Sequence, residues 1–106
     1  MDKVSWGYDF DCDKTIEAIH AVFKAGGRWQ WTIGDSDIYG DYLKCRPKER
    51  ADIRVYDARQ FWRWSAGDRE GFWGELTCDG EDRHDIDQKF RDLLGGINAT
   101  NISASS

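Results

Sequence analysis

The chain has 106 residues, of which 40% are hydrophobic and 33% charged, with a formal net charge of −5. This balance is typical of one soluble globular domain and argues against wholesale disorder. No apolar run approaches the roughly 20 residues that cross a bilayer, so a membrane partner is not expected. The acidic charge argues against nucleic acid as the main partner, since phosphate binding needs a basic surface.

The three cysteines, Cys12, Cys45 and Cys78, are widely spaced and form no CxxC pair. Their odd number argues against a disulfide framework, and their spacing argues against a zinc site. The N-terminus lacks the basic segment followed by an apolar one that marks a secretion signal. We therefore expect a cytoplasmic protein with reduced thiols, no bound metal and no cofactor.

The N-terminal half contains an alternating run from Val4 to Phe10, which predicts a half-buried first strand. A helix is expected next, with Asp13 as its N-cap and Gly26-Gly27 as its end. Residues 29–33 and 38–45 then read as the second and third strands, joined by a polar turn.

The C-terminal half continues with predicted strands at residues 51–56, 61–64 and 72–78. The last element is a helix, because apolar residues recur at offsets of 4, 7, 8 and 11 from Ile86, which forms an apolar stripe ending at Ile97. Residues 98–106 are polar and small, and we expect them to form a flexible C-terminal tail.

These elements follow the order β-α-β-β-β-β-β-α, and residues 1–97 form a single domain in this interpretation. Short connections between successive strands favour antiparallel pairing. Two amphipathic helices can bury their apolar stripes on one face of such a sheet. The predicted fold class is α+β, an antiparallel sheet of about five to six strands with two helices on one face.

Aromatic residues are more numerous than a small core needs, with six Trp, five Phe and four Tyr. If the helices cover one face of the sheet, strand alternation assigns a consistent inner set. That set is Tyr8, Phe10, Trp29, Trp31, Ile33, Leu43, Ile53, Val55, Trp62, Trp64, Phe72 and Leu76.

The same alternation turns a second set of aromatic and charged side chains outward. These residues are Arg54, Tyr56, Phe61, Arg63, Trp73 and Glu75. Trp, Tyr and Arg dominate the hot spots of protein interfaces, so this face is a candidate binding surface. Cross-strand pairing or a covering loop is the alternative, and stacking of single-stranded bases on these rings is another.

Charge is unevenly distributed along the chain. Residues 46–64 carry six Arg or Lys against three acids, whereas residues 65–85 carry seven acids against two arginines. Glu81 and Asp82 in the acidic segment are candidate partner-binding residues, because a dipolar surface can orient a partner. The alternative is that the two segments pair with each other within the sheet.

Residues 11–16, in which Asp11 and Asp13 precede Thr15, resemble the DxDxT motif of haloacid-dehalogenase-type phosphatases. The resemblance implies a nucleophilic Asp11, an acid/base Asp13 and Mg²⁺ between them. The segment Gly34-Asp35-Ser36-Asp37 resembles that family's second metal-binding segment. Carboxylates at strand ends suit Mg²⁺, and the metal would neutralise the developing phosphoryl charge.

The hypothesis that the sequence favours is a small, non-enzymatic, protein-binding module. Its most specific form is an inhibitor or immunity-type antagonist that uses the aromatic face and the acidic segment to cover a larger protein. Self-association into a homodimer would use the same face. Two alternatives are Mg²⁺-dependent phosphoryl transfer at Asp11 and Asp13 and a small-ligand-binding domain.

Overall fold

The computed structural model describes residues 2–36, 40–57 and 71–105. In chain order the elements are β1 (Lys3–Asp11), α1 (Ile16–Gly26), β2 (Trp31–Ser36), β3 (Gly40–Cys45), β4 (Asp52–Asp57), β5 (Phe72–Asp79), the 3₁₀ helix η2 (Gly80–Asp82), α3 (Arg83–Gly96) and β6 (Thr100–Ser105). The predicted strand at residues 61–64 lies outside the described residues.

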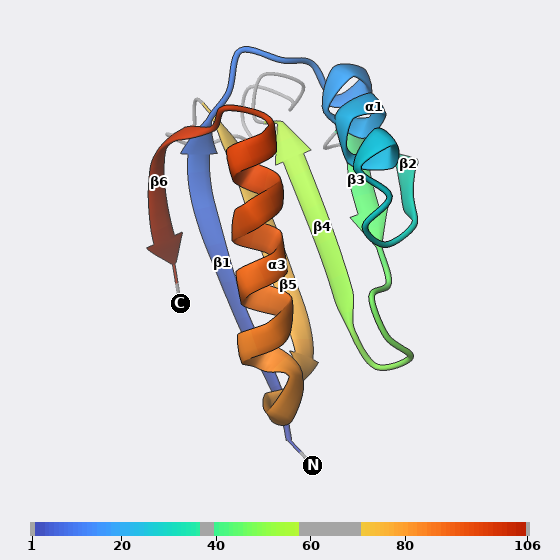
Figure 1. Ribbon diagram of the computed structural model, residues 1–106, viewed down its shortest axis with the longest axis vertical. Coiled ribbons are helices and arrows are strands. Elements are labelled where there is room, and N and C mark those ends of the chain that lie inside the picture. Colours follow the sequence, from blue (N-terminus) through green and yellow to red (C-terminus); the bar gives the residue numbers. More distant parts are fainter. Residues whose placement is uncertain (1, 37–39, 58–70, 106) are drawn as a thin grey trace.

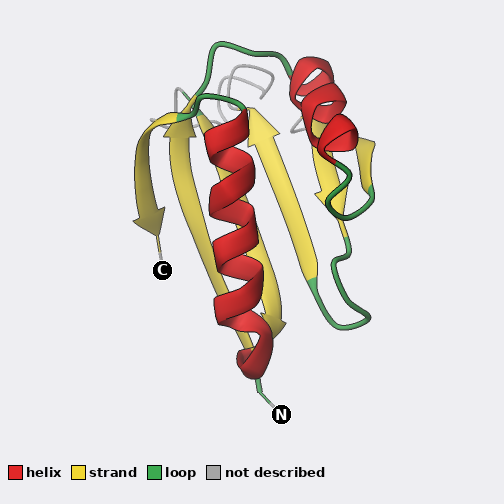
Figure 2. Cartoon of the chain, in the orientation of Figure 1, coloured by secondary structure: helices red, strands yellow, loops and turns green. Residues whose placement is uncertain are grey.

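The strands form one antiparallel sheet in the order β2-β3-β4-β5-β1-β6 (Figure 1). Both helices lie over the same face of this sheet (Figure 2). The predicted α+β class, with an antiparallel sheet and two helices on one face, is confirmed. The strands at the two edges of the sheet are β2 and β6.

The N-cap of helix α1 is Thr15, two residues after Asp13, which the sequence predicted in that role. The Thr15 hydroxyl accepts a hydrogen bond from the Ala18 amide (3.2 Å) and caps the helix. The helix ends at Gly27, whose φ of 72° is the left-handed conformation that glycine adopts without strain. Asp13 remains exposed before the cap, so its predicted capping role is wrong.

Helix α3 packs its buried stripe of Ile86, Phe90 and Leu94 against the central strands. Gly74 of β5 makes room for it, since a Cβ atom at this position would lie 2.9 Å from Cζ of Phe90. Tyr8 of β1, the cross-strand partner of Gly74, stacks with the Phe90 ring, with centroids 6.0 Å apart. A strand glycine therefore sets how closely the helix approaches the sheet.

Most of the predicted inner set is buried in one core, namely Tyr8, Phe10, Trp31, Leu43, Ile53, Val55, Phe72 and Leu76. Trp29 is half-buried against that core, and Trp62 and Trp64 lie outside the described residues. Ile33 differs from the prediction because it is 39% exposed. It lies on edge strand β2, where no further strand flanks it within the described chain.

The predicted C-terminal tail contains strand β6, which pairs with β1 (Tyr8 with Ala104, Asp11 with Thr100). The register shifts between Asp9 and Asp11, as at a β-bulge. This strand differs from the flexible segment that was predicted at residues 98–106. Its sequence is mostly small and polar and gives only a weak strand signal, and the strand forms by pairing with β1.

Neither helix in the described ranges combines the length and the apolar character that crossing a membrane would require.

Candidate binding site at the β2 edge

The predicted binding face is assembled in part by the strand register. Arg54 pairs with Glu75 and Tyr56 with Trp73 across β4 and β5, all on the face opposite the helices. Phe61 and Arg63, the other members of the predicted set, lie outside the described residues. Arg54 and Glu75 are exposed.

Tyr56 and Trp73 are buried, with exposures of 6% and 7%, which corrects the prediction that they form an open surface. The Tyr56 ring lies between Tyr42 and Trp73, with centroid separations of 5.3 and 5.0 Å. Burial raises the pKa of Tyr56 above its ordinary value. These rings form a cross-strand row that serves as a second small core, since ring pairs at this spacing stabilise the sheet.

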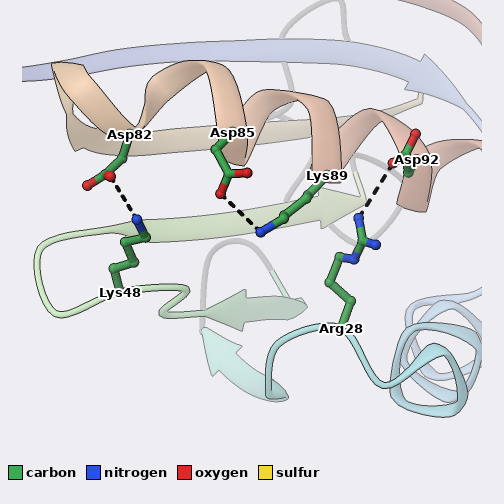
Figure 3. Close-up of polar contacts among 6 residues, drawn as sticks. All are labelled: Arg28, Lys48, Asp82, Asp85, Lys89 and Asp92. Carbon is green, nitrogen blue, oxygen red and sulfur yellow. Dashed lines mark hydrogen bonds and ion pairs between the residues drawn. The ribbon is translucent and has the colours of Figure 1, made fainter.

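Part of the acidic segment is engaged within the chain. Asp82 accepts a hydrogen bond from Lys48 (2.7 Å), and Asp79 pairs with Arg50 (3.0 Å). Figure 3 shows the Lys48–Asp82 contact beside two further ion pairs along α3. Glu81 is exposed next to them. The basic and acidic segments thus pair with each other, and exposed pairs of this kind add little stability.

Asp79, Glu81 and Asp82 place one carboxylate oxygen each within 4.8 Å of one another. Lys48 and Arg50 already occupy two of these carboxylates. The hydrogen bond with Asp82 raises the pKa of Lys48, so the ammonium stays charged. A cation would have to displace both side chains, and the arrangement is therefore explained by internal ion pairing.

The two phosphatase-like segments are far apart in the sheet. Asp11 ends β1 and accepts a hydrogen bond from Asn101 (2.8 Å), whereas Asp35 lies on β2. Strands β3, β4 and β5 separate them, and the sheet is antiparallel throughout. The resemblance implies adjacent segments on a parallel sheet, so its metal-bridged arrangement is not assembled here.

Two of the three cysteines are core residues. Cys45 and Cys78 are buried, and burial raises the pKa of Cys45 to about 12. Cys12 donates a hydrogen bond to the carbonyl oxygen of Ile97 (3.5 Å). Thiols are reactive as thiolates, so the two buried cysteines are inert packing residues.

A groove of about 650 Å³ runs between helix α1 and edge strand β2. The helix contributes His20 and Lys24, and the strand side contributes Trp29, Trp31 and Ile33. His20 donates from Nε2 to the carbonyl oxygen of Trp31 (2.9 Å), which fixes the helix beside the start of the strand. The groove is lined mainly by aromatic and apolar surface, as ligand sites usually are.

Trp31 carries a buried polar atom that lacks a partner. Its side chain lies 4.8 Å from Phe23, centroid to centroid, and the residue is only 5% exposed. Its Nε1 is buried without a hydrogen-bond partner among the described residues. Neighbouring Trp29 adopts a φ of 60°, a conformation uncommon for residues other than glycine. Unsatisfied donors and strained backbone both concentrate at functional sites.

A second hollow, of about 380 Å³, opens on the other face of the same edge. Thr32, Lys44 and Arg54 form a row across β2, β3 and β4 in register. Arg46 and Asp52 complete the charged lining and form an exposed ion pair (3.7 Å). Three cations against one carboxylate give this hollow a formal charge of +2, opposite in sign to the whole chain.

The edge of β2 lies between these two hollows, which share Gln30 and Thr32 in their linings. Within the described chain no strand pairs with the outer side of β2. Its sequence contains neither proline nor lysine, and its pairing with β3 is continuous from Trp31 to Ser36. Asp35 is the one charged residue of β2, and the Trp31 carbonyl already accepts a hydrogen bond from His20. The rest of the strand lacks the proline, lysine or bulge that protects many edges.

The sequence offered only a partial signal for this site. The alternation of Trp29, Trp31 and Ile33 identified the helix-facing side of the strand correctly. It could not show that β2 lies at an edge, because strand order is not encoded in local pattern.

No protein-family model matches this sequence, and no curated protein matches it closely enough to count as a relative. Function is therefore argued from the geometry of the β2 edge.

Proposed function

We propose that this protein is a non-enzymatic, protein-binding module that takes up an extended segment of a larger protein along the edge of β2. The observation that carries the proposal is an edge strand without an outer partner in residues 2–36, 40–57 and 71–105, with a hollow on each face. In strand addition, main-chain hydrogen bonds give affinity and pockets for alternate side chains give specificity. The edge position of β2 supports the first requirement, and the two hollows beside it support the second.

The site differs from the surface that the sequence favoured, although the class of function is the same. Ile33 is exposed and available for contact, whereas Tyr56 and Trp73 are not. An inhibitor or antagonist would act here by occupying a segment that its target needs for another interaction. Strand addition suits that role because it covers the segment along its length.

Selection of random linear peptides displayed on phage tests this proposal, with the purified chain as bait. Peptides that bind the wild type should bind Ile33→Lys more than about tenfold more weakly, because a charge would enter an apolar contact. Fluorescence polarisation with the synthetic peptides gives the affinities. The fold should be unaffected, since Ile33 is a partly exposed surface residue.

Ile102→Lys is the matched control. Ile102 is 47% exposed and lies on β6, the other edge strand. Peptide affinity should be the same for this variant as for the wild type. Equal losses in both variants, or failure to select any peptide, would contradict the proposal. Light scattering on the free chain must also show a monomer, because a dimer that Ile33→Lys dissociates would assign the β2 edge to self-association.

A further inference from the structure

We infer that the segment bound at β2 alternates apolar and acidic side chains. This inference rests on the proposed function and specifies the chemistry of its partner. A strand added to an edge continues the pleat of the sheet, so its successive side chains point to opposite faces. The two faces beside β2 differ in chemistry, and each selects its own residue type.

The helix-side groove selects the apolar residues. Its strand wall is formed by Trp29, Trp31 and Ile33, and Ile33 is one of the exposed large apolar side chains of the described chain. The ring centroids of Trp29 and Trp31 lie 6.2 Å apart, and the two rings are tilted by 50° relative to each other. Both rings therefore contribute aromatic surface to this wall of the groove. Burying an apolar side chain there stabilises the complex by about 25 cal/mol per Å² removed from water.

The opposite face selects the acidic residues. Lys44 lies beside Thr32 on the strand next to the edge, and Arg54 lies one strand further in. Arg46 lies at the end of the same row, and Asp52 is the single carboxylate in this hollow. An acidic side chain of the added strand would lie directly beside Thr32, and Lys44, one strand further in, is the nearest cation of the row.

The groove on the helix side reinforces this choice. Lys24 of α1 is exposed at its rim, and none of the residues lining the groove is acidic. Beside the residues that line the two hollows, a lysine-bearing segment would meet a cation on each face, and Asp35 of β2 lies beyond both linings. Like charges across a pair of strands destabilise it, so the site discriminates against basic segments.

The length of β2 sets the extent of the recognised segment. Its six residues span about 20 Å at roughly 3.3 Å per residue. An added strand of that length presents half of its side chains to each face. The segment that β2 binds is therefore expected to be a short strand in which apolar and acidic residues alternate.

Three synthetic peptides of equal length test the inference by fluorescence polarisation. The first alternates valine and glutamate, the second valine and lysine, and the third serine and glutamate. The valine–glutamate peptide should bind, and the other two should bind at least about tenfold more weakly. Lys44→Glu should weaken binding of the valine–glutamate peptide and strengthen binding of the valine–lysine peptide.

Lys3→Glu is the matched control, because Lys3 is exposed on β1, away from β2, and the change in net charge is the same. It should leave both affinities unchanged. Equal binding of the valine–glutamate and valine–lysine peptides at β2 would overturn the acidic alternation and leave the proposed function standing. Equal effects of Lys44→Glu and Lys3→Glu would also overturn it. Failure of all three peptides to bind would count against both proposals.

Discussion

The indole of Trp31 is packed as a core residue but retains an unpaired polar atom. The residue is 5% exposed and contacts Phe23 and Trp29, yet its Nε1 has no partner in the described ranges. A buried donor without an acceptor weakens a fold by about 1–3 kcal/mol. Folding therefore leaves this donor unsatisfied in a residue that lines the proposed binding groove.

Replacing Trp31 tests whether its unsatisfied N–H lowers the free energy of unfolding. Trp31→Phe keeps an aromatic ring and removes the donor, so the free energy of unfolding should fall by less than about 1.5 kcal/mol. Trp31→Ala opens a cavity and should lower it by about 3–5 kcal/mol. Urea unfolding gives both values. A Phe variant as unstable as the Ala variant would show that the indole N–H is satisfied in solution.

For Tyr56 and Trp73, the sequence predicted the face of the sheet but not the burial of the side chains. Alternation placed Tyr56 and Trp73 on the face opposite the helices, and the register agrees. Tyr42 contacts the Tyr56 ring, and it does so because β3 pairs with β4 at that register. The face of a residue follows from local pattern, whereas its exposure follows from lateral neighbours that the pattern does not contain.

At the scale of elements, the contact between α3 and β5 determines how the helix layer sits on the sheet. Phe90 lies over Gly74, and no side chain larger than hydrogen fits there without movement. The Phe90 ring is fully buried and is held by Tyr8 as well. The helix layer therefore has little freedom to shift away from an added atom.

Gly74→Ala should lower the free energy of unfolding by about 1–3 kcal/mol, because its new methyl group overpacks the core against Phe90. Gly95→Ala in α3 provides the comparison, since its Cβ would meet nothing within 4 Å. That change should stabilise the helix by about 0.5–1 kcal/mol. Thermal unfolding measures both variants. A neutral Gly74→Ala would mean that the helix does not pack this closely.

The two edge strands show which elements the sequence could predict. Strand β2 was expected because Trp29 to Ile33 alternates, although its edge position was not. Strand β6 was missed because residues 100–105 are mostly small and polar. It forms by pairing with β1, so this strand depends on a tertiary contact and not on its own sequence pattern. Local sequence predicted the strands with apolar faces and could not predict one that depends on its neighbour.

At the scale of the whole molecule, charge is organised in two ways. Part of the acidic segment is paired with the loop after β3, through Lys48–Asp82 and Arg50–Asp79. Lys44 of β3 is exposed on the strand next to the β2 edge, and Arg54, which pairs with Glu75 in register, is exposed one strand further in. The formal net charge of −5 thus conceals a local positive surface. Such a surface can steer an acidic segment toward the edge.

The central claim is that a partner segment becomes a strand beside β2, and amide hydrogen exchange tests it most directly. The edge amides of residues 31–36 should exchange faster than those of the central strand β5 in the free chain. Saturation with the valine–glutamate peptide should slow the exchange of residues 31–36 and leave residues 100–105 of β6 unchanged. Slowing confined to β6, or binding that leaves the β2 amides unprotected, would contradict strand addition at this edge.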